Sequence, residues 1–327
     1  MRQTPLLILA YNRAEKVRDL VDALRGLGPQ LVMVVVDGPK PGDPVDAEKV
    51  RAVRDAVSAI DWGATVLTRF RPSNVGLRRS VVDAVNWAVS EYGQVIVIEE
   101  DVIPGPGFLP YAEYMLDAYR DDERVAHISG YNVVPDTALT PGAENRLTRY
   151  PESIAWATWD RAWKHYNDEL NWPGARRNRE LRALTGSRAT ALRWRQNFAD
   201  ARAGRISTWA YRWIASIWST DSFVLSPNHN LVTYVGHDEG THTLTTAPWG
   251  ELPLYTGPIN ALLTSDARYD APADAWVSRV VFGGTALGVA KGVLISAALG
   301  FRKRRRAART ARALRGSAEI GANSAGE

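Results

Sequence analysis

Residues 95–109 read VIVIEEDVIPGPGFL, and this stretch indicates both a fold class and a site. Its first four residues form an apolar run, typical of a strand covered on both faces in a parallel sheet. Glu99, Glu100 and Asp101 follow at once, so we expect them at the carboxyl end of a central strand, where open α/β sheets bind ligands. Carboxylates this crowded raise one another's pKa unless a cation or hydrogen-bond donors neutralise them. Carboxylate oxygens are ligands that suit Mg²⁺ or Mn²⁺. The alternative interpretation of these three residues is a solvated acidic turn without a ligand.

The first 130 residues alternate between predicted strands and predicted helices. Short apolar runs predict the strands, and apolar residues at helical spacing predict the helices. Strands separated by helices form parallel βαβ units. The sequence therefore predicts an α/β fold with a doubly wound, mostly parallel sheet and helices on both faces. The strands are expected at 5–10, 31–36, 64–70 and 95–98, and the helices at 14–27, 46–60 and 77–92.

The composition is that of a globular protein, with 45% hydrophobic and 23% charged residues. The 327 residues include no cysteine, which excludes disulfides and thiolate metal sites and is typical of a reducing compartment. Eight of the 40 Lys and Arg residues lie in 302–315, which leaves 32 basic and 36 acidic residues elsewhere. A body that binds nucleic acid is therefore not indicated. The apolar part of MRQTPLLILAYNR is too short to predict a signal peptide or a membrane span.

Polar residues follow the first two predicted strands. The first strand runs into Ala10-Tyr11-Asn12-Arg13, without the glycines of a GxGxxG motif, so hydride transfer with NAD is not expected. Tyr11 has a ring that can stack on a base, and Arg13 has a guanidinium that suits a phosphate. Asp37, at the end of the second strand, can accept a hydrogen bond from a base or ribose at the same sheet edge.

The stretch RFRPSNVGLRRSVVDAVNWA, residues 69–88, adds a second phosphate signal. Asn74 precedes a predicted helix whose first turn holds Arg78 and Arg79, where cations oppose the helix dipole. A bound diphosphate would offset that cost, because helix N-termini and arginines both favour phosphate. We therefore expect these residues beside the strand-end carboxylates.

Eight of the twelve tryptophans lie between residues 156 and 218, mainly in SIAWATWDRAWKHY and STWAYRWIASIW. Aromatic residues at helical spacing form core more often than ligand platforms, yet Trp rings also stack on sugars. For this Trp-rich helical region, a core and a cleft for a sugar acceptor therefore both remain open.

The order of AYNR, VVVDG, NVGLRRSV, VIVIEED and PGPGFL resembles that in GT-A glycosyltransferases, with EED at the place of their DxD motif. EEDVIPGPGFLPYAEYML is similar to the EDD-type motif of the N-acetylglucosaminyltransferase I group and to bacterial family-2-like sugar transferases. SIAWATWDRAWK resembles their acceptor-side Trp segment, and LSPNHNLVTYVGHDEGTHT resembles their C-terminal segment. The resemblance covers residues 5 to about 245. It implies a metal-dependent, inverting transfer of a sugar from a nucleotide-diphosphate sugar to a glycan or lipid-linked acceptor, in cell-envelope polysaccharide synthesis.

The resemblance also implies a role for each candidate residue. Asp101 would coordinate Mn²⁺ or Mg²⁺, and His242, or His237, would be a further metal ligand. The remaining candidates would hold the donor around the metal. They are Tyr11, Asn12, Arg13, Asp37, Asn74, Arg78, Arg79, Glu99 and Glu100.

The resemblance does not identify the general base that an inverting reaction needs. Related enzymes often carry a carboxylate in a segment that here reads Trp209-Ala210-Tyr211-Arg212-Trp213, with none. Asp238 or Glu239 in GHDEGTHT and Asp160 in ATWDRAW are the nearby carboxylates, and we expect the base at Asp238, ahead of Asp160. Two alternatives remain open. One is a catalytically weak sugar-nucleotide-binding subunit or sensor, and the other is a sugar nucleotidyltransferase, whose Gly-rich signature AYNR lacks.

Four regions are expected along the chain. They are a nucleotide-sugar-binding half (1–130), an acceptor-side half of the same domain (131–270), an apolar then basic helical segment (271–315) and a disordered tail (316–327). The apolar stretch 277–301 precedes the Arg-rich run, which suits attachment to anionic lipids, and a helix packed on the body is the alternative. The positive-inside tendency then predicts a cytoplasmic protein at the inner face of the membrane.

Overall fold

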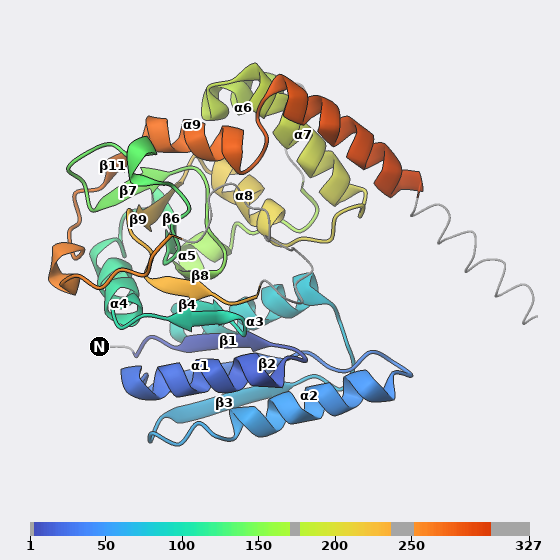
Figure 1. Ribbon diagram of the computed structural model, residues 1–327, viewed down its shortest axis with the longest axis vertical. Coiled ribbons are helices and arrows are strands. Elements are labelled where there is room, and N and C mark those ends of the chain that lie inside the picture. Colours follow the sequence, from blue (N-terminus) through green and yellow to red (C-terminus); the bar gives the residue numbers. More distant parts are fainter. Residues whose placement is uncertain (1–2, 171–176, 237–251, 302–327) are drawn as a thin grey trace, which may run out of the picture.

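The computed structural model describes residues 3–170, 177–236 and 252–301 (Figure 1). Within them, nine strands form one sheet in the order β11-β7-β9-β6-β8-β4-β1-β2-β3, and two further strands pair as β10-β5. Five of the eight neighbouring pairs in the large sheet are parallel, so the predicted α/β class with a mostly parallel sheet is confirmed. The strands are β1 (Leu6–Ala10), β2 (Leu31–Val36), β3 (Thr65–Phe70), β4 (Gln94–Glu99), β5 (Val102–Pro104), β6 (Val125–Ser129), β7 (Asn145–Thr148), β8 (Ala155–Trp159), β9 (Phe223–Pro227), β10 (Val232–Tyr234) and β11 (Arg268–Tyr269).

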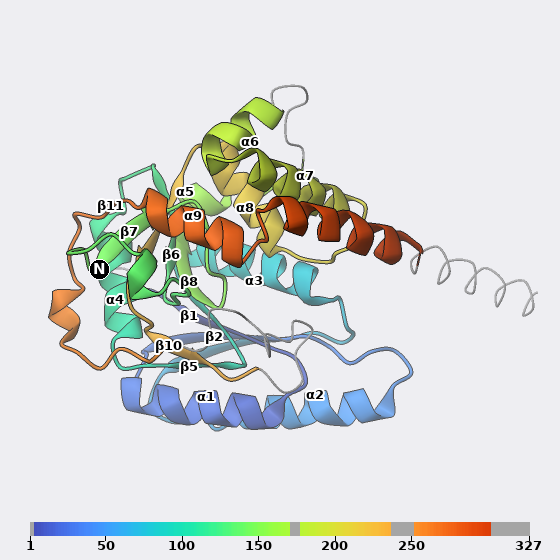
Figure 2. The same ribbon diagram turned by 45° about the horizontal axis from the view of Figure 1, so that its top comes forward.

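Helices cover both faces of the sheet, as predicted. Figure 2 shows α1 and α2 side by side on one face, with α3 and the helices α6 to α9 on the other side of the sheet. The helices are α1 (Ala14–Leu27), α2 (Pro44–Val57), α3 (Leu77–Tyr92), α4 (Phe108–Ala118), α5 (Asp160–Trp163), α6 (Arg177–Thr185), α7 (Arg188–Arg202), α8 (Ala210–Ser219) and α9 (Ala271–Val280), with short 3₁₀ turns at Asp136–Ala138 and Ile259–Ala261.

The first half of the chain folds almost as its apolar pattern predicts. The predicted bounds of α1, β2 and α3 match the structure, and α2 lies slightly earlier, at Pro44–Val57 rather than 46–60. β1 and β2 are buried along their whole length, whereas β3, at the edge of the sheet, is largely exposed. The register Ile8↔Ile98 and Ala10↔Val36 brings the carboxyl ends of β4, β1 and β2 together.

One antiparallel strand, β8, lies between β4 and β6. It pairs Ala155 with Ile98 and Trp159 with Gln94. Because β8 runs against β4, its end points to the edge of the sheet opposite the carboxylates. The strand order therefore separates residues that follow β8 from residues that follow β4.

The tryptophans form core. Seven of the eight between residues 156 and 218 lie in the described part of the chain, and each is at most 3% exposed. Trp156 stacks on His127 and on Trp209, with ring centroids 5.1 and 5.3 Å apart. Trp213 Nε1 donates to His127 Nδ1 at 3.1 Å, and burial lowers the pKa of His127 to about 3, so this imidazole is neutral inside the core. The aromatic cluster joins β6, β8 and α8 into one packed body.

The apolar stretch near the C-terminus is a pair of helices separated by a turn, α9 and a second helix over residues 286–301. Among the described residues, we find no helix that combines the length and the apolar character needed to cross a membrane.

Replacing Trp156 by Ala should lower the free energy of unfolding by about 3–5 kcal/mol, because it removes a fully buried ring from the centre of the cluster. Urea denaturation followed by fluorescence and circular dichroism measures this change. Val45→Ala is the matched control, since Val45 is 65% exposed and should change stability by less than about 0.5 kcal/mol. Equal small losses in both variants would contradict a structural role for the cluster.

Candidate functional site

A cavity of about 370 Å³ lies at the carboxyl ends of β4, β1 and β2. The start of α3 and one residue of β10, Tyr234, complete its wall. This is the edge that the sequence predicts for a ligand. The cavity is lined by Leu9, Ala10, Tyr11, Arg13, Asp37, Lys40, Asn74, Gly76, Leu77, Ser80, Val81, Glu99, Glu100, Asp101 and Tyr234.

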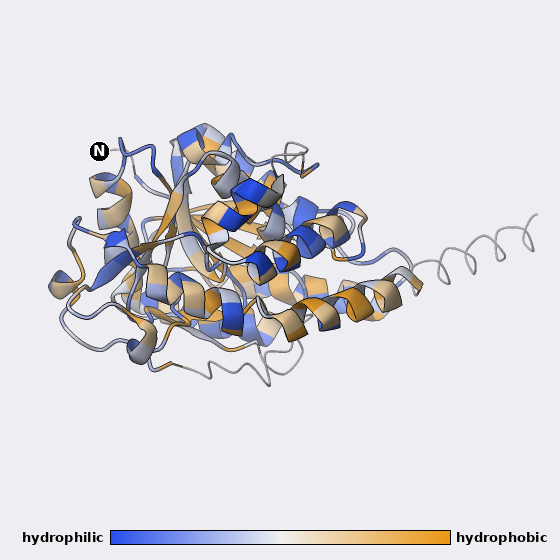
Figure 3. Cartoon of the chain, turned by 90° about the horizontal axis from the view of Figure 1, so that it is seen from above, coloured by the Kyte–Doolittle hydropathy of each residue, from blue (hydrophilic) through white to orange (hydrophobic). Residues whose placement is uncertain are grey.

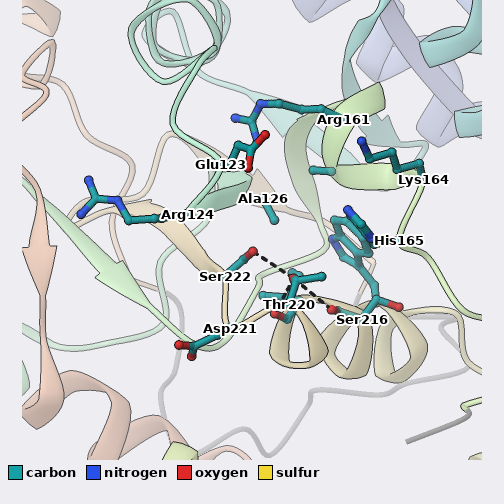
Figure 4. A pocket seen from close by; sticks show the side chains of 13 residues that line it. Glu123, Arg124, Ala126, Arg161, Lys164, His165, Ser216, Thr220, Asp221 and Ser222 are labelled. Atoms are coloured by element: carbon teal, nitrogen blue, oxygen red, sulfur yellow. Dashed lines mark hydrogen bonds between the residues drawn. The ribbon is translucent and has the colours of Figure 1, made fainter.

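A second cavity, of about 410 Å³, lies at the opposite edge, near the beginnings of β6 and β9. Figure 4 shows Arg124 and Lys164 on different sides of this cavity, with Glu123 beside Arg161. The guanidinium of Arg161 donates to the carbonyl oxygens of Tyr119, Arg120 and Val125, so it holds the chain together there. We therefore assign the candidate site to the carboxylate cavity.

Arg13 ties the end of β1 to the end of β4. Its Nη1 donates to Asp101 Oδ2 at 2.6 Å, and its Nε lies 3.8 Å from Glu100 Oε1. The backbone N–H of Tyr11 donates to Glu100 Oε2 at 2.7 Å. Glu100 and Asp101 are 8% and 7% exposed, so these contacts form with little competition from water.

One arginine does not neutralise the carboxylate cluster. Burial, followed by repulsion from Asp101 and Glu100, raises the pKa of Glu99 to about 8. Burial also raises the pKa of Glu100 to about 7, although the Tyr11 N–H and Arg13 act in the opposite direction. The two glutamates therefore gain from protonation or from a further positive charge, and burial contributes more to this than the crowding that the sequence indicated.

The small β5–β10 sheet holds Asp101 from its other side. Tyr234 pairs with Val102, and the Val235 N–H donates to the carbonyl of Asp101 at 2.9 Å. A Cβ on Gly236 would lie 2.5 Å from Asp101 Oδ2, so a glycine is required for this close approach. The predicted residues Asp238 and His242, as well as His237, follow Gly236 in the sequence and lie outside the described residues.

Asp46 is a site residue that the sequence analysis missed. Its Oδ2 accepts from the Tyr11 hydroxyl at 2.6 Å and its Oδ1 from Asn12 Nδ2 at 2.7 Å, while the Lys40 N–H donates to Oδ2 at 2.8 Å. Asp46 is 4% exposed, at the start of α2, and therefore fixes the Tyr11 ring beside the cavity. The available signal was an acidic residue in the first turn of a helix, which usually indicates only a helix start.

Asp37 organises the loop that enters α3. It accepts three backbone N–H groups, from Gly38, Val75 and Gly76, at 2.8 to 3.1 Å. Asn74 Nδ2 donates to the Gly38 carbonyl at 3.2 Å. Asp37 and Asn74 thus both lie at the cavity, as predicted, and their bonds position the N-terminal end of α3 against it.

Arg78, Arg79 and Asp160 are not brought to this cavity, contrary to expectation. Arg78 forms an ion pair with Asp168, and Arg79 Nε lies 3.6 Å from Asp83, so carboxylates of the protein rather than a phosphate compensate them. Both line a separate cavity, because α3 turns these positions away from the carboxylates. Asp160 follows β8, at the opposite edge of the sheet. Its N–H donates to the carbonyl oxygen of Gly93, just before β4.

Glu152 is a second residue that the sequence analysis missed. It precedes β8, and its N–H donates to Ser129 Oγ, at the end of β6, at 3.2 Å. Because β8 runs antiparallel to β4, Glu152 lies at the same edge of the sheet as Glu99. Burial raises the pKa of Glu152 to about 7, and Arg146 lowers it in part. A carboxylic acid that titrates near neutral pH is suited to proton transfer. A lone acid in YPESIAW gave no pattern that could have indicated it.

The described residues contain no group of three or more His, Cys, Asp or Glu side chains arranged to hold a metal ion. Comparison with protein families found no family model that matches this chain, and comparison with curated proteins found no match.

Glu99→Gln should stabilise the ligand-free protein at pH 8.5 but not at pH 5. The folded-state pKa of Glu99 is raised to about 8, so the folded protein favours the protonated side chain. The free energy of unfolding therefore falls as pH rises from the ordinary pKa of a glutamate to about 8. Gln stays neutral at every pH, so the melting temperature of the variant at pH 8.5 should exceed that of the wild type by about 2–6 °C. Thermal melts across pH test this, with the exposed Glu48→Gln as control. A Glu99→Gln variant that melts with wild type at every pH would contradict the raised pKa.

Proposed function

We propose that this protein is a metal-dependent, inverting glycosyltransferase of the GT-A type that uses a nucleotide-diphosphate sugar. The observation that carries the proposal is the convergence, on one cavity, of the strand-end carboxylates, Arg13 and the N-terminal end of α3. A diphosphate needs positive charge and N–H donors, and a divalent cation needs carboxylate oxygens. Both sets of groups border the same 370 Å³ space.

The chain's own residues suit a nucleoside diphosphate. Tyr11 presents a ring fixed by Asp46, with Lys40 Nζ 5.9 Å from the ring centroid, which supports base stacking beside a cation. Gly76 caps α3 with a φ of 83° and has no side chain to cover the first-turn N–H groups. These groups, together with Arg13 and Lys40, are the donors that we propose for the phosphates.

The carboxylates fit a hard divalent cation. Asp101 and Glu100 both lie near the Arg13 guanidinium, and burial together with the neighbouring carboxylates raises the pKa of Glu99 and Glu100, which a further positive charge would offset. Mg²⁺ is commonly held by one or two carboxylates together with substrate phosphates, so a cage made only of protein side chains is not required. We propose Asp101 as the principal ligand, and His242 remains a predicted one. A bound Mn²⁺ or Mg²⁺ would polarise the leaving diphosphate and offset its charge.

Inversion requires a base on the acceptor side. The acceptor hydroxyl oxygen forms a bond to the anomeric carbon while the bond from that carbon to the diphosphate oxygen breaks, and the base takes the hydroxyl proton. Asp238 remains the predicted base. Glu152 is the described candidate, because it lies at the correct edge with a pKa of about 7.

The same cavity would also serve a sugar-nucleotide sensor or a catalytically weak subunit. The Arg13–Asp101 contact favours this second function, since it already occupies one oxygen of the proposed ligand. Release of nucleoside diphosphate from a panel of nucleotide sugars, with and without Mn²⁺, distinguishes turnover from binding alone. We place the reaction in the cytoplasm, at the inner membrane face when the acceptor is lipid-linked.

Asp101→Asn should lower Mn²⁺-dependent turnover of the donor at least about 100-fold, because the principal ligand loses its charge. Calorimetry with a nucleoside diphosphate should show loss of the Mn²⁺ dependence of binding, and circular dichroism should show an unchanged fold. Asp117→Asn is the matched control, since Asp117 is exposed on α4. Full Mn²⁺ stimulation in the Asp101 variant would overturn the assignment.

Asp238→Asn should lower kcat of sugar transfer about 100-fold or more, with little change in donor affinity, as expected for loss of a general base. Asp160→Asn should leave kcat unchanged, because Asp160 lies at the opposite sheet edge. Glu152→Gln is measured in parallel. If Glu152→Gln strongly lowers kcat while Asp238→Asn remains active, the base would be assigned to Glu152.

A further inference from the structure

The helix over residues 286–301 carries its bulky apolar side chains on the outside. Leu287, Leu294 and Phe301 are 66%, 72% and 60% exposed, and Val293 and Ile295 are each 54% exposed. A surface helix of a globular protein ordinarily turns such residues toward the core. Figure 3 shows the apolar colour along this helix, which ends the described part of the chain.

The opposite side of this helix is small and polar, and it is the side that packs on the body. Ser296 donates to Asp200 Oδ1 and accepts from Gln196 Nε2 at 2.7 Å, and both partners belong to α7. A Cβ on Gly292 would lie 2.0 Å from Arg193 Nη1, so the absence of a side chain here leaves room for the guanidinium in its present position. The contacts with α7 fix the rotation of the helix, and the apolar row faces outward as a consequence.

The exposed residues form a continuous row. Leu287, Leu294 and Phe301 are spaced by seven residues, or about two helical turns, so they lie above one another on one side of the helix. Exposed apolar rows of this kind mark interaction surfaces. Because the other side is held by α7, a partner can cover the helix from one side only.

The two helices beside this helix, and the sequence that follows it, are rich in basic residues. The sequence from 177 to 205, which spans α6 and α7, contains eight arginines and two acidic residues. Arg182, Arg188 and Arg202 are exposed there. Figure 2 shows α6 and α7 beside the helix. The next stretch of sequence, 302–315, adds eight Lys and Arg and no acidic residue.

We infer that the helix over residues 286–301 docks in the plane of an anionic membrane surface. Its apolar row would enter the boundary between headgroups and acyl chains, and the basic residues nearby would be attracted to the lipid phosphates. A second copy of the chain is a poorer occupant, because two such surfaces would bring like charges together. An anionic bilayer supplies both an apolar layer and negative charge.

Co-sedimentation of the full chain with vesicles tests this surface. We expect binding to vesicles that contain phosphatidylglycerol, weaker binding to pure phosphatidylcholine, and loss of binding as salt increases. The triple variant Leu287→Ser, Leu294→Ser and Phe301→Ser should lower the partition coefficient at least about tenfold. Its side chains are exposed, so the fold should be retained, and circular dichroism checks this. Val45→Ser, on the distant helix α2, is the matched control and should bind as wild type.

A second variant separates charge from apolar contact. Replacing the eight Lys and Arg of 302–315 by Gln should remove most of the salt dependence, while the triple Ser variant should keep it. Three outcomes would overturn the proposal. They are equal binding to neutral and anionic vesicles, wild-type binding by the triple Ser variant, and a concentration-dependent dimer in light scattering that the same triple variant abolishes.

Discussion

The contact between Arg13 and Asp101 is the constraint on which the site depends. It joins the ends of two neighbouring parallel strands, and it forms only because β1 lies directly beside β4 in the sheet. Glu100 also lies within reach of Arg13, so one guanidinium serves two buried carboxylates. A buried charge without a partner is costly, and the fold must therefore keep these strand ends in register.

The compensation is incomplete, and this is what connects the fold to function. Because the pKa values of Glu99 and Glu100 are raised to about 8 and about 7, both groups are protonated to a greater extent at neutral pH than ordinary glutamates. A cation that binds beside them must displace those protons, so its affinity should rise with pH. A fully neutralised cluster would be more stable, but it would leave nothing for a cation to gain. Under the proposed function, the incomplete neutralisation would lower the stability of the ligand-free protein and strengthen cation binding.

Much of the first half of the chain could be predicted, because its strands are short apolar runs and its helices have regular apolar spacing. The positions of Asp37 and Asn74 followed from strand and turn ends. Asp160 could not be placed correctly, since nothing local in the sequence says that β8 runs antiparallel between β4 and β6. Arg78 and Arg79 share the helix start with the cavity, but Arg78 turns to Asp168, which only the tertiary fold brings near, and Arg79 pairs with Asp83 four residues on in the same helix.

The C-terminal helix shows the same dependence on tertiary contacts. Its apolar composition is visible in the sequence, but composition alone does not say which side of the helix meets the body. That choice is made by α7, which presents Arg193, Gln196 and Asp200 along one line and therefore needs a polar, close-fitting neighbour. Gly292 and Ser296 meet this need, and the larger apolar side chains are left on the outer side. The exposed row is thus a consequence of the polar contacts with α7, which leave the larger apolar side chains on the outer side of the helix.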